Sequence, residues 1–234
     1  MTAIYQREMR SYLTSAVGYV FLAVFYAIAG YYFFATSLVS NSTDLSYVFS
    51  NLFSIVIFLV PMLTMRLFSE ERRQKTEQAL FTAPVSFTGV VMGKFLACLT
   101  MYLLGMGVTL LYFLVMCAFQ IPDVAVFCGN FLGLFLLGAA LCAIGIFISS
   151  LTESQVIAAV GSLAIGLFLL FANSFTPVVS SEWINAVMDG ISFYQHYLDS
   201  TRGLLNLSDL TFFISVTALF LFLTVRHLER RRIS

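Results

Sequence analysis

Residues 127–150 read FCGNFLGLFLLGAALCAIGIFISS, a stretch that contains no Asp, Glu, Lys, Arg or His. The stretch is longer than the ~20 apolar residues that an α-helix needs to cross a bilayer, so it predicts a membrane-spanning helix. Other apolar runs precede and follow it, separated by short polar segments. The six predicted spans are residues 17–39, 48–65, 89–118, 127–150, 155–179 and 209–226. We therefore expect an all-α integral membrane protein with six transmembrane helices.

The basic residues lie almost entirely on one side of these spans. If the N-terminus is cytoplasmic, all of the 12 Lys and Arg residues except Arg202 fall on the cytoplasmic side. The positive-inside rule then places both termini in the cytosol, and the chain is expected to be a multi-pass protein of the cell's inner (cytoplasmic) membrane. A composition of 60% hydrophobic and 10% charged residues excludes a soluble domain with a polar surface. The basic clusters flank spans, which indicates topology and not a nucleic-acid partner.

The N-terminal segment, residues 1–16, is predicted to be a short helix of its own. Ile4 and Met9 lie near one helical face, and Arg7 and Glu8 stand between them in the sequence. This pattern is typical of a helix that lies on the inner membrane surface before the first span. The alternative is a lead-in that only positions that span.

The segment 66–88 between the second and third spans is the longest cytoplasmic connection. Two pairs of opposite charge stand four residues apart in it, Glu71 with Lys75 and Arg73 with Glu77. Such pairs meet on a helix surface and contribute ~0.2–0.5 kcal/mol each. The segment is therefore predicted to be a short charged helix, able to contact a peripheral cytosolic protein. The alternative is a solvated loop.

The longest outer segment, residues 180–208, carries two apolar patterns of helical spacing. The first pattern consists of Trp183, Ile184, Val187, Met188 and Ile191, and the second of Phe193, Tyr194, Tyr197 and Leu198. These spacings predict two short helices that dip into the outer leaflet.

Ionisable side chains are expected to be absent from the interior of the spans, where only mild polar residues such as Thr100, Thr109 and Ser162 occur. Ion-coupled transporters and proton pumps need charged groups there. Energy for any transport is therefore expected to come from another subunit. The spacing of Gly129 and Gly133 predicts close helix packing.

The sequence offers no candidate for catalysis, and no cofactor or metal site is expected. The run Gly89 to Lys94 lacks the spacing and the following Ser or Thr of a phosphate-binding loop. His196 and His227 are predicted to be interface side chains. The four cysteines, Cys98, Cys117, Cys128 and Cys142, lack metal-site spacing and are predicted to fill helix contacts, with a Cys117–Cys128 disulfide as the alternative.

Four segments resemble the ABC-2 type transporter permeases. Residues 65–86, MRLFSEERRQKTEQALFTAPVS, are similar to the family pattern M-R-x-x-x-E-E-x-x-x-G-T-x-E-x-L-x-x-x-P-x-S. Residues 149–155 resemble its S-S-L-T-x-x-Q loop, and residues 193–210 and 223–229 resemble its C-terminal part. The closest branch is the gliding-motility-associated permease group. The sequence departs from the pattern at Lys75, where the family has Gly, and at Ala16, where it often has Pro.

The resemblance implies a six-helix ABC-2 fold, similar to type V exporters, that forms one permease domain over residues 1–234. It implies an interfacial N-terminal helix, a coupling helix within residues 66–88 and outer re-entrant gate helices within residues 180–208. The implied contacts to a cytosolic ATPase are Glu70, Glu71, Arg73 and Thr76, with Phe68, Leu80 and Pro84 positioning the coupling helix. The implied outer-gate residues are Trp183, Phe193, Tyr197 and Arg202.

The resemblance also implies a half-transporter that pairs with a second permease copy or a paralogue and with an ATPase dimer. The expected cargo of this exporter is a hydrophobic or lipid-linked molecule or a peptide, and ATP would be bound by the partner subunit. The alternative is a membrane scaffold or mechanotransmission subunit that recruits a membrane protein with a large extracytoplasmic domain. An intramembrane enzyme or an ion-coupled carrier is disfavoured by the missing ionisable residues.

Overall fold

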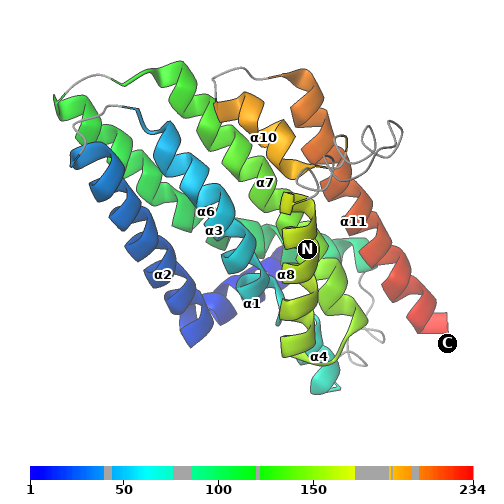
Figure 1. The fold of residues 1–234 in the computed structure, drawn as a ribbon. Helices are drawn as coiled ribbons and strands as arrows, with labels where there is room; N and C mark the ends of the chain where they lie inside the picture. The colour runs from blue at the N-terminus through cyan, green and yellow to red at the C-terminus, as the bar shows by residue number, and fades with distance from the viewer. Residues whose placement is uncertain are drawn as a thin grey trace.

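The computed structural model describes residues 1–39, 44–75, 86–119, 122–171, 190, 192–201 and 206–233, and every regular element in these ranges is helical (Figure 1). The elements are α1 (Thr2–Thr14), α2 (Ala16–Tyr32), η1 (Phe33–Leu38), α3 (Ser46–Thr64), α4 (Ser69–Arg73), α6 (Phe87–Phe119), α7 (Val124–Leu151), α8 (Gln155–Phe171), α10 (Phe193–Thr201) and α11 (Leu207–Ile233). The predicted all-α class is confirmed for this part of the chain.

Five helical stretches among the described residues are long and apolar enough to cross a membrane. They are Ala16–Leu38, Ser46–Arg73, Phe87–Phe119, Val124–Leu151 and Leu207–Arg231. Each contains or closely matches one predicted span. The remaining predicted span, residues 155–179, corresponds to α8 up to Phe171, and its last residues lie outside the described ranges. The count of six spans therefore stays a prediction.

Helix α7 occupies the centre of the bundle and packs against α3, α6, α8, α10 and α11 (Figure 1). Its glycines permit this close packing, because a methyl group at Gly138 would overlap the ring of Tyr102, and one at Gly145 would overlap Thr64. Tyr102 also donates its hydroxyl to the carbonyl of Leu134 over 2.7 Å, which fixes α6 against α7. The apolar composition that predicted a span also supplies the small residues that let neighbouring helices approach.

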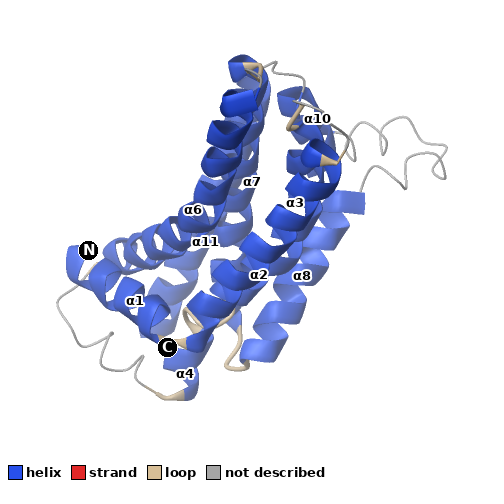
Figure 2. Cartoon of the chain, turned by 90° about the vertical axis from the view of Figure 1, so that its left-hand side faces the viewer, coloured by secondary structure: helices blue, strands red, loops and turns tan. Residues whose placement is uncertain are grey.

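The two ends of the bundle differ in charge. The basic end, as we call it, consists of α1, α4 with the turns that flank it (residues 65–68 and 74–75), the first turns of α6 and α8 and the last turns of α7 and α11, and it carries every described Lys and Arg residue. The opposite end consists of η1, α10 and the first turns of α3, α7 and α11. Figure 2 shows α1, α4 and the C-terminus together at the basic end and α10 far from them.

Helix α1 lies across the basic end instead of continuing α2. The chain breaks at Ser15, whose backbone is extended with φ −99° and ψ 152°. Tyr12 then anchors α1 by donating its hydroxyl to the carbonyl of Leu63 over 2.7 Å. The segment predicted to be an N-terminal helix is thus helical from Thr2 to Thr14, and its place at a membrane surface stays a prediction.

Candidate functional site

Helix α4 begins where the chain after α3 meets the end of α7. The backbone N–H groups of Phe68 and Ser69 donate to Ser149 Oγ over 3.1 and 3.2 Å. The Ser149 hydroxyl in turn donates to the carbonyl of Met65 over 3.1 Å. Ser149 therefore satisfies N–H groups at the start of α4 as an N-cap side chain would, although it comes from another helix. This contact fixes α4 to the end of α7.

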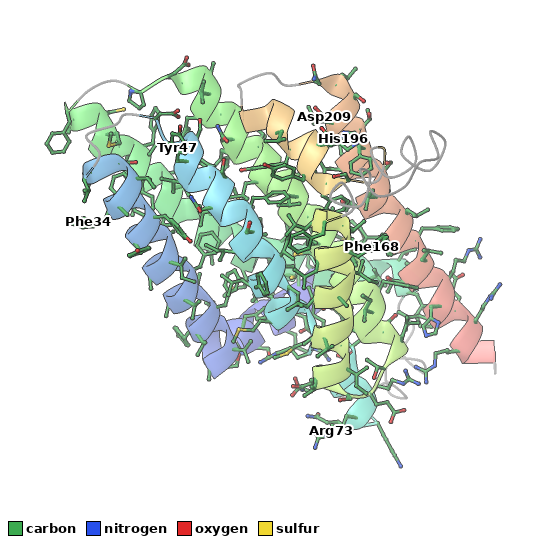
Figure 3. The ribbon with its side chains drawn as sticks, in the orientation of Figure 1. Phe34, Tyr47, Arg73, Phe168, His196 and Asp209 are labelled. Atoms are coloured by element: carbon green, nitrogen blue, oxygen red, sulfur yellow. The ribbon has the colours of Figure 1, made fainter. Side chains whose placement is uncertain are left out.

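Arg72 makes a second link between the same two elements. Its Nη1 donates to the carbonyl of Leu151 over 2.7 Å, and its Nε lies 3.3 Å from Glu153 Oε1. The planar guanidinium can engage a carbonyl and a carboxylate at once, which makes Arg suited to such a junction. Arg73, the next residue, projects from the far side of α4 (Figure 3).

Lys94 projects from α6 into an ionic cluster at the basic end. Its Nζ lies 2.9 Å from Glu8 Oε1 of α1 and 3.0 Å from Glu71 Oε1 of α4, and it donates to the carbonyl of Leu67 over 2.6 Å. Arg7 pairs with both carboxylates as well. We call Arg7, Glu8, Glu71 and Lys94 the Lys94 cluster. Its two cations and two carboxylates balance, so α1, α4 and α6 meet through charges that neutralise one another.

The burial of Lys94 makes this balance necessary. The residue is 1% exposed, and its Nζ lies 4.9 Å from the ring centroid of Phe68. A buried ammonium without partners would be strongly destabilising. Burial by itself raises the pKa of Glu8, but Lys94 and then Arg7 favour the carboxylate and hold this pKa below its ordinary value. Glu8 is therefore ionised at neutral pH and matches the charge of Lys94.

The prediction that the spans hold no ionisable side chain is wrong for Lys94, which lies within the predicted span 89–118 and within α6. Lys94 was counted among the basic residues on the cytoplasmic side of the spans, and so it was interpreted as a residue that only flanks the membrane. The signal that could have identified its role was the combination of Lys94 with Glu8 on a helix expected at the same end. Gly93 supports that approach, because a methyl group there would crowd Ile4 of α1.

The predicted ion pair between Glu71 and Lys75 is also wrong. Glu71 pairs with Arg7 and Lys94 instead. The physical reason is that α4 ends at Arg73 and Lys75 adopts φ 57°, which takes its side chain off the helical face. The second predicted pair, Arg73 with Glu77, involves a residue outside the described ranges.

The comparison with known families agrees with this arrangement. The sequence model of the ABC-2 family transporter protein matches residues 2–230. The chain belongs to the ABC-2 transporter family. No curated protein matches the chain. Together with the five apolar helices, the family identifies a multi-pass membrane protein and a permease subunit of an ABC transporter, a class that works with an ABC ATPase.

Within this ABC-2 permease, the residues expected to contact an ATPase differ in accessibility. Phe68 is buried, and the side chain of Glu71 is only 17% exposed within the Lys94 cluster. The side chain of Glu70 is 39% exposed and lies 3.8 Å from Arg66, and Arg73 is exposed. The expected contact Thr76 and the expected positioning residues Leu80 and Pro84 lie outside the described ranges. Among the described residues of this expected set, Glu70 and Arg73 are therefore the ones that a partner can reach.

The chain departs from the ABC-2 pattern at Lys75, where the backbone conformation favours glycine. The pattern has Gly at this position, and among the described residues other than glycine Lys75 is the one with positive φ, at 57°. A glycine would adopt this left-handed conformation without a steric penalty, whereas a side chain makes it unfavourable. The turn that ends α4 is thus formed here in spite of the side chain.

At the opposite end, the described outer-gate candidates are buried aromatic anchors of α10. Tyr197 donates its hydroxyl to the carbonyl of Phe49 over 3.1 Å and stacks on Phe53 with ring centroids 4.6 Å apart. Phe193 packs edge-on against Phe213, at 5.4 Å between centroids. The other two candidates, Trp183 and Arg202, lie outside the described ranges.

A partly buried His–Asp pair at this end was missed by the sequence reasoning. Figure 3 shows His196 of α10 beside Asp209 of α11, and the His196 Nδ1 lies 2.6 Å from Asp209 Oδ1. The His196 ring stacks on Phe212, with centroids 4.1 Å apart. A spacing of thirteen residues does not predict that two side chains on different helices meet.

The cysteines do not form the disulfide that had been left open. Cys117 and Cys128 are free and exposed, whereas Cys98 and Cys142 are buried with their Sγ atoms 3.3 Å apart. Cys98 and Cys142 lie between α6 and α7, as predicted for side chains that fill helix contacts, but the same prediction is wrong for Cys117 and Cys128, which are exposed.

Proposed function

We propose that the chain is the membrane-spanning permease of an ABC exporter and that α4 is the element on which its cytosolic ATPase acts. The observation that carries the proposal is that the two sides of α4 have different surroundings. One side of this helix is tied to α1, α6 and α7 by charged and polar contacts, and the other side presents Arg73 and part of Glu70. A helix built in this way can receive a force and pass it on.

The transmission of that force follows from the contacts. A push on α4 would reach α6 and α1 through the Lys94 cluster, and α7 through Ser149 and Arg72. Since α6 and α7 run the length of the bundle, a displacement of α4 would be carried to the opposite end. Packed helices move as rigid bodies in such transitions, because their interfaces do not deform continuously.

The orientation and assembly belong to the same proposal. The positive-inside rule would place the basic end in the cytosol, with both termini there and six spans in all, in the inner membrane. The chain would pair with a second permease copy or a paralogue and leave ATP binding and hydrolysis to the partner, so it would itself be neither an enzyme nor a cofactor-binding protein. The expected cargo is a hydrophobic or lipid-linked molecule or a peptide, and membership of the gliding-motility-associated group is part of the proposal.

The first test is affinity purification of the tagged protein in mild detergent, with mass spectrometry of the proteins that co-elute. We expect a stoichiometric P-loop ATPase. The variant Arg73→Glu should lose it, and the matched variant Arg73→Lys, which keeps the charge, should retain it. The double variant Glu70→Arg with Glu71→Arg should also lose the ATPase. Unchanged co-elution with Arg73→Glu and with the double variant would rule out α4 as the docking element.

The scaffold alternative is separated by a second measurement. The complex is reconstituted in vesicles, and ATP hydrolysis is measured with and without candidate hydrophobic solutes. Stimulation of hydrolysis, or movement of a solute, supports the exporter. Recovery of the chain with only an outer-domain protein, and no ATPase, would favour the scaffold.

A further inference from the structure

The exposed side of α3 carries polar side chains that continue far along this membrane helix. Tyr47, Ser50 and Ser54 are exposed at helical spacing, and Asn51 is half-buried beside them. Tyr47 is 64% exposed and lies near the start of α3 (Figure 3). A helix rises about 1.5 Å per residue, so Ser54 lies about 12 Å from Ser46, the first residue of α3, and near the middle of the helix. We call Tyr47, Ser50, Asn51 and Ser54 the α3 stripe.

The neighbouring membrane helices expose a different kind of surface. Helices α2 and α8 pack against α3, one on either side of it (Figures 1 and 2). Every exposed residue of α8 is apolar, with Val156, Val160 and Phe168 as examples, and so is every exposed residue of α6 after Thr88. Such side chains are suited to contact with lipid tails, which are equally apolar. The α3 stripe does not match that environment.

The hydroxyl groups of Ser50 and Ser54 form no hydrogen bond with any described residue. Helix α11 offers a direct comparison, because the exposed residues Thr211 and Ser215 lie four and eight residues after its start, as Ser50 and Ser54 do in α3. Each of the two α11 hydroxyls donates to a carbonyl of its own helix over 2.8 Å. Asn51 Nδ2 donates within α3 over 2.7 Å, which leaves its amide oxygen as an acceptor. The α3 stripe therefore holds hydrogen-bonding groups that no described residue uses.

The chemistry of the stripe indicates what covers it. Lipid tails offer no partner to a hydroxyl or an amide, so polar groups on the exposed side of a span indicate another helix. The stripe contains no Asp, Glu, Lys, Arg or His, and thus has no charge to attract a charged partner. Hydroxyl and amide groups both donate and accept hydrogen bonds, so the stripe is complementary to a second copy of itself. A two-fold axis requires this self-complementarity, because the same surface of both subunits forms the contact.

We propose that two copies of this chain meet at the α3 stripe. The inference rests on the proposed function, which requires two permease subunits, and it specifies the face and an identical partner. Ser50, Asn51 and Ser54 exchange hydrogen bonds with the second copy, and Tyr47 packs at one end of the contact. Phe58, which is 52% exposed and lies one turn beyond Ser54, packs at the other end.

This position connects the dimer contact to the helix on which the ATPase acts. Residues Ser46–Arg73, which include both α3 and α4, form one continuous helical stretch. A displacement of α4 therefore moves α3, and with it the surface that touches the second copy. In this arrangement the two permease subunits change their contact when the ATPase moves α4.

The test measures dimerisation of the full chain in lipid vesicles. Copies that carry a donor or an acceptor dye are mixed, and energy transfer between them is followed as lipid is added to dilute the protein. The triple variant Ser50→Ala, Asn51→Leu and Ser54→Ala should raise the dissociation constant roughly ten-fold. This change equals about 1.4 kcal/mol and corresponds to about two interhelical hydrogen bonds of the mean strength measured in membranes.

The matched control is the double variant Thr211→Val with Ser215→Ala, which removes two exposed hydroxyls from α11 and should leave the dissociation constant unchanged. A second measurement avoids the triple variant and uses oxidative cross-linking in chains that lack the exposed Cys117 and Cys128. Ser54→Cys should give a disulfide-linked dimer, and Ser215→Cys should give none.

Three outcomes would overturn the proposal. The first is an unchanged dissociation constant without a cross-link at position 54, and the second is equal weakening in the α11 control. The third is recovery of a different permease, and no second copy of the chain, when two differently tagged copies are co-expressed and purified. Co-elution of the ATPase is recorded in the same samples. Its presence with any of these outcomes refutes the interface alone, whereas its absence from the original protein refutes the proposed function.

Discussion

Different interactions hold the helices together at the basic end and at the opposite end of this permease. At the basic end, α1, α4 and α6 meet through the Lys94 cluster, in which four charges share a largely buried site. At the opposite end, α10 is fixed mainly by aromatic packing, together with a hydrogen bond between His196 and Asp209. Charge-assisted hydrogen bonds depend on donor and acceptor geometry, whereas aromatic packing depends on close contact between ring surfaces. The comparison teaches that α4 is built to move only together with its neighbours.

The largest expected effect comes from breaking the Lys94 cluster. Lys94→Met keeps most of the side-chain volume but removes the buried cation that Glu8 and Glu71 share. Removing one partner of a buried ion pair costs about 3–5 kcal/mol, and we expect a loss of that order in the free energy of unfolding. The measurement is unfolding by SDS titration in mixed micelles. Arg73→Met, a change at an exposed arginine, is the control and should alter stability by less than about 0.5 kcal/mol. Equal stability of the two variants would contradict the role of the cluster.

Breaking the contact between His196 and Asp209 at the opposite end should cost less stability. His196→Phe leaves the Asp209 carboxylate buried without its partner, and we expect a cost of about 1–3 kcal/mol. Asp209→Leu should cost a similar amount. The double variant should lose less than the two single variants together, because the remaining partner no longer lies unpaired. Strict additivity in this double-mutant cycle would mean that the two side chains do not interact.

Acid should lower the free energy of unfolding, because it protonates Glu8 at the basic end. The pKa of Glu8 is lower in the folded protein than its ordinary value of 4.5, so the folded state binds this proton less readily than the unfolded state. Its stabilising contribution is complete above the ordinary pKa and is lost as the pH falls through the folded-state pKa. Glu8→Gln should therefore reduce the loss of stability between about pH 5 and pH 3. An identical pH profile for the variant would exclude Glu8 as a source of the acid sensitivity.

The smallest expected effect is a gain in stability. Lys75→Gly should relieve the unfavourable left-handed backbone at the end of α4 and raise the free energy of unfolding by about 1 kcal/mol. Lys75→Ala removes the same charge and keeps the side-chain penalty, so it should give no gain. A comparable rise with alanine would attribute the effect to charge and not to the backbone.

Much of the fold could be predicted from the sequence. The apolar runs located the described membrane helices to within a few residues, because hydropathy over some twenty residues is a local property. The N-terminal helix and a charged helix after the second span were also anticipated. The length of that second helix was overestimated, since the pairing of Glu71 with Lys75 assumed a helix that in fact ends at Arg73.

The candidate site was predicted only in part, because its contacts join residues far apart in the chain. Glu8 and Lys94 are 86 positions apart, and Phe68 and Ser149 are 81 apart. The resemblance indicated the segments that hold Glu71 and Ser149 but not that they meet. His196 and Asp209 belong to different helices, so their contact likewise does not follow from their spacing in the sequence.

The sequence by itself determined which segments are apolar enough to cross a membrane and that positive charge collects at one end, because both depend on residues near one another in the chain. Only the tertiary structure decided which charges are neutralised inside the fold and which remain exposed. Glu71 became a partly buried partner of Lys94, whereas Arg73 and Arg230 kept their exposed positions. The reason is physical: the effect of a charge depends on its distance to other charges and on its burial, and both are set only when the helices pack.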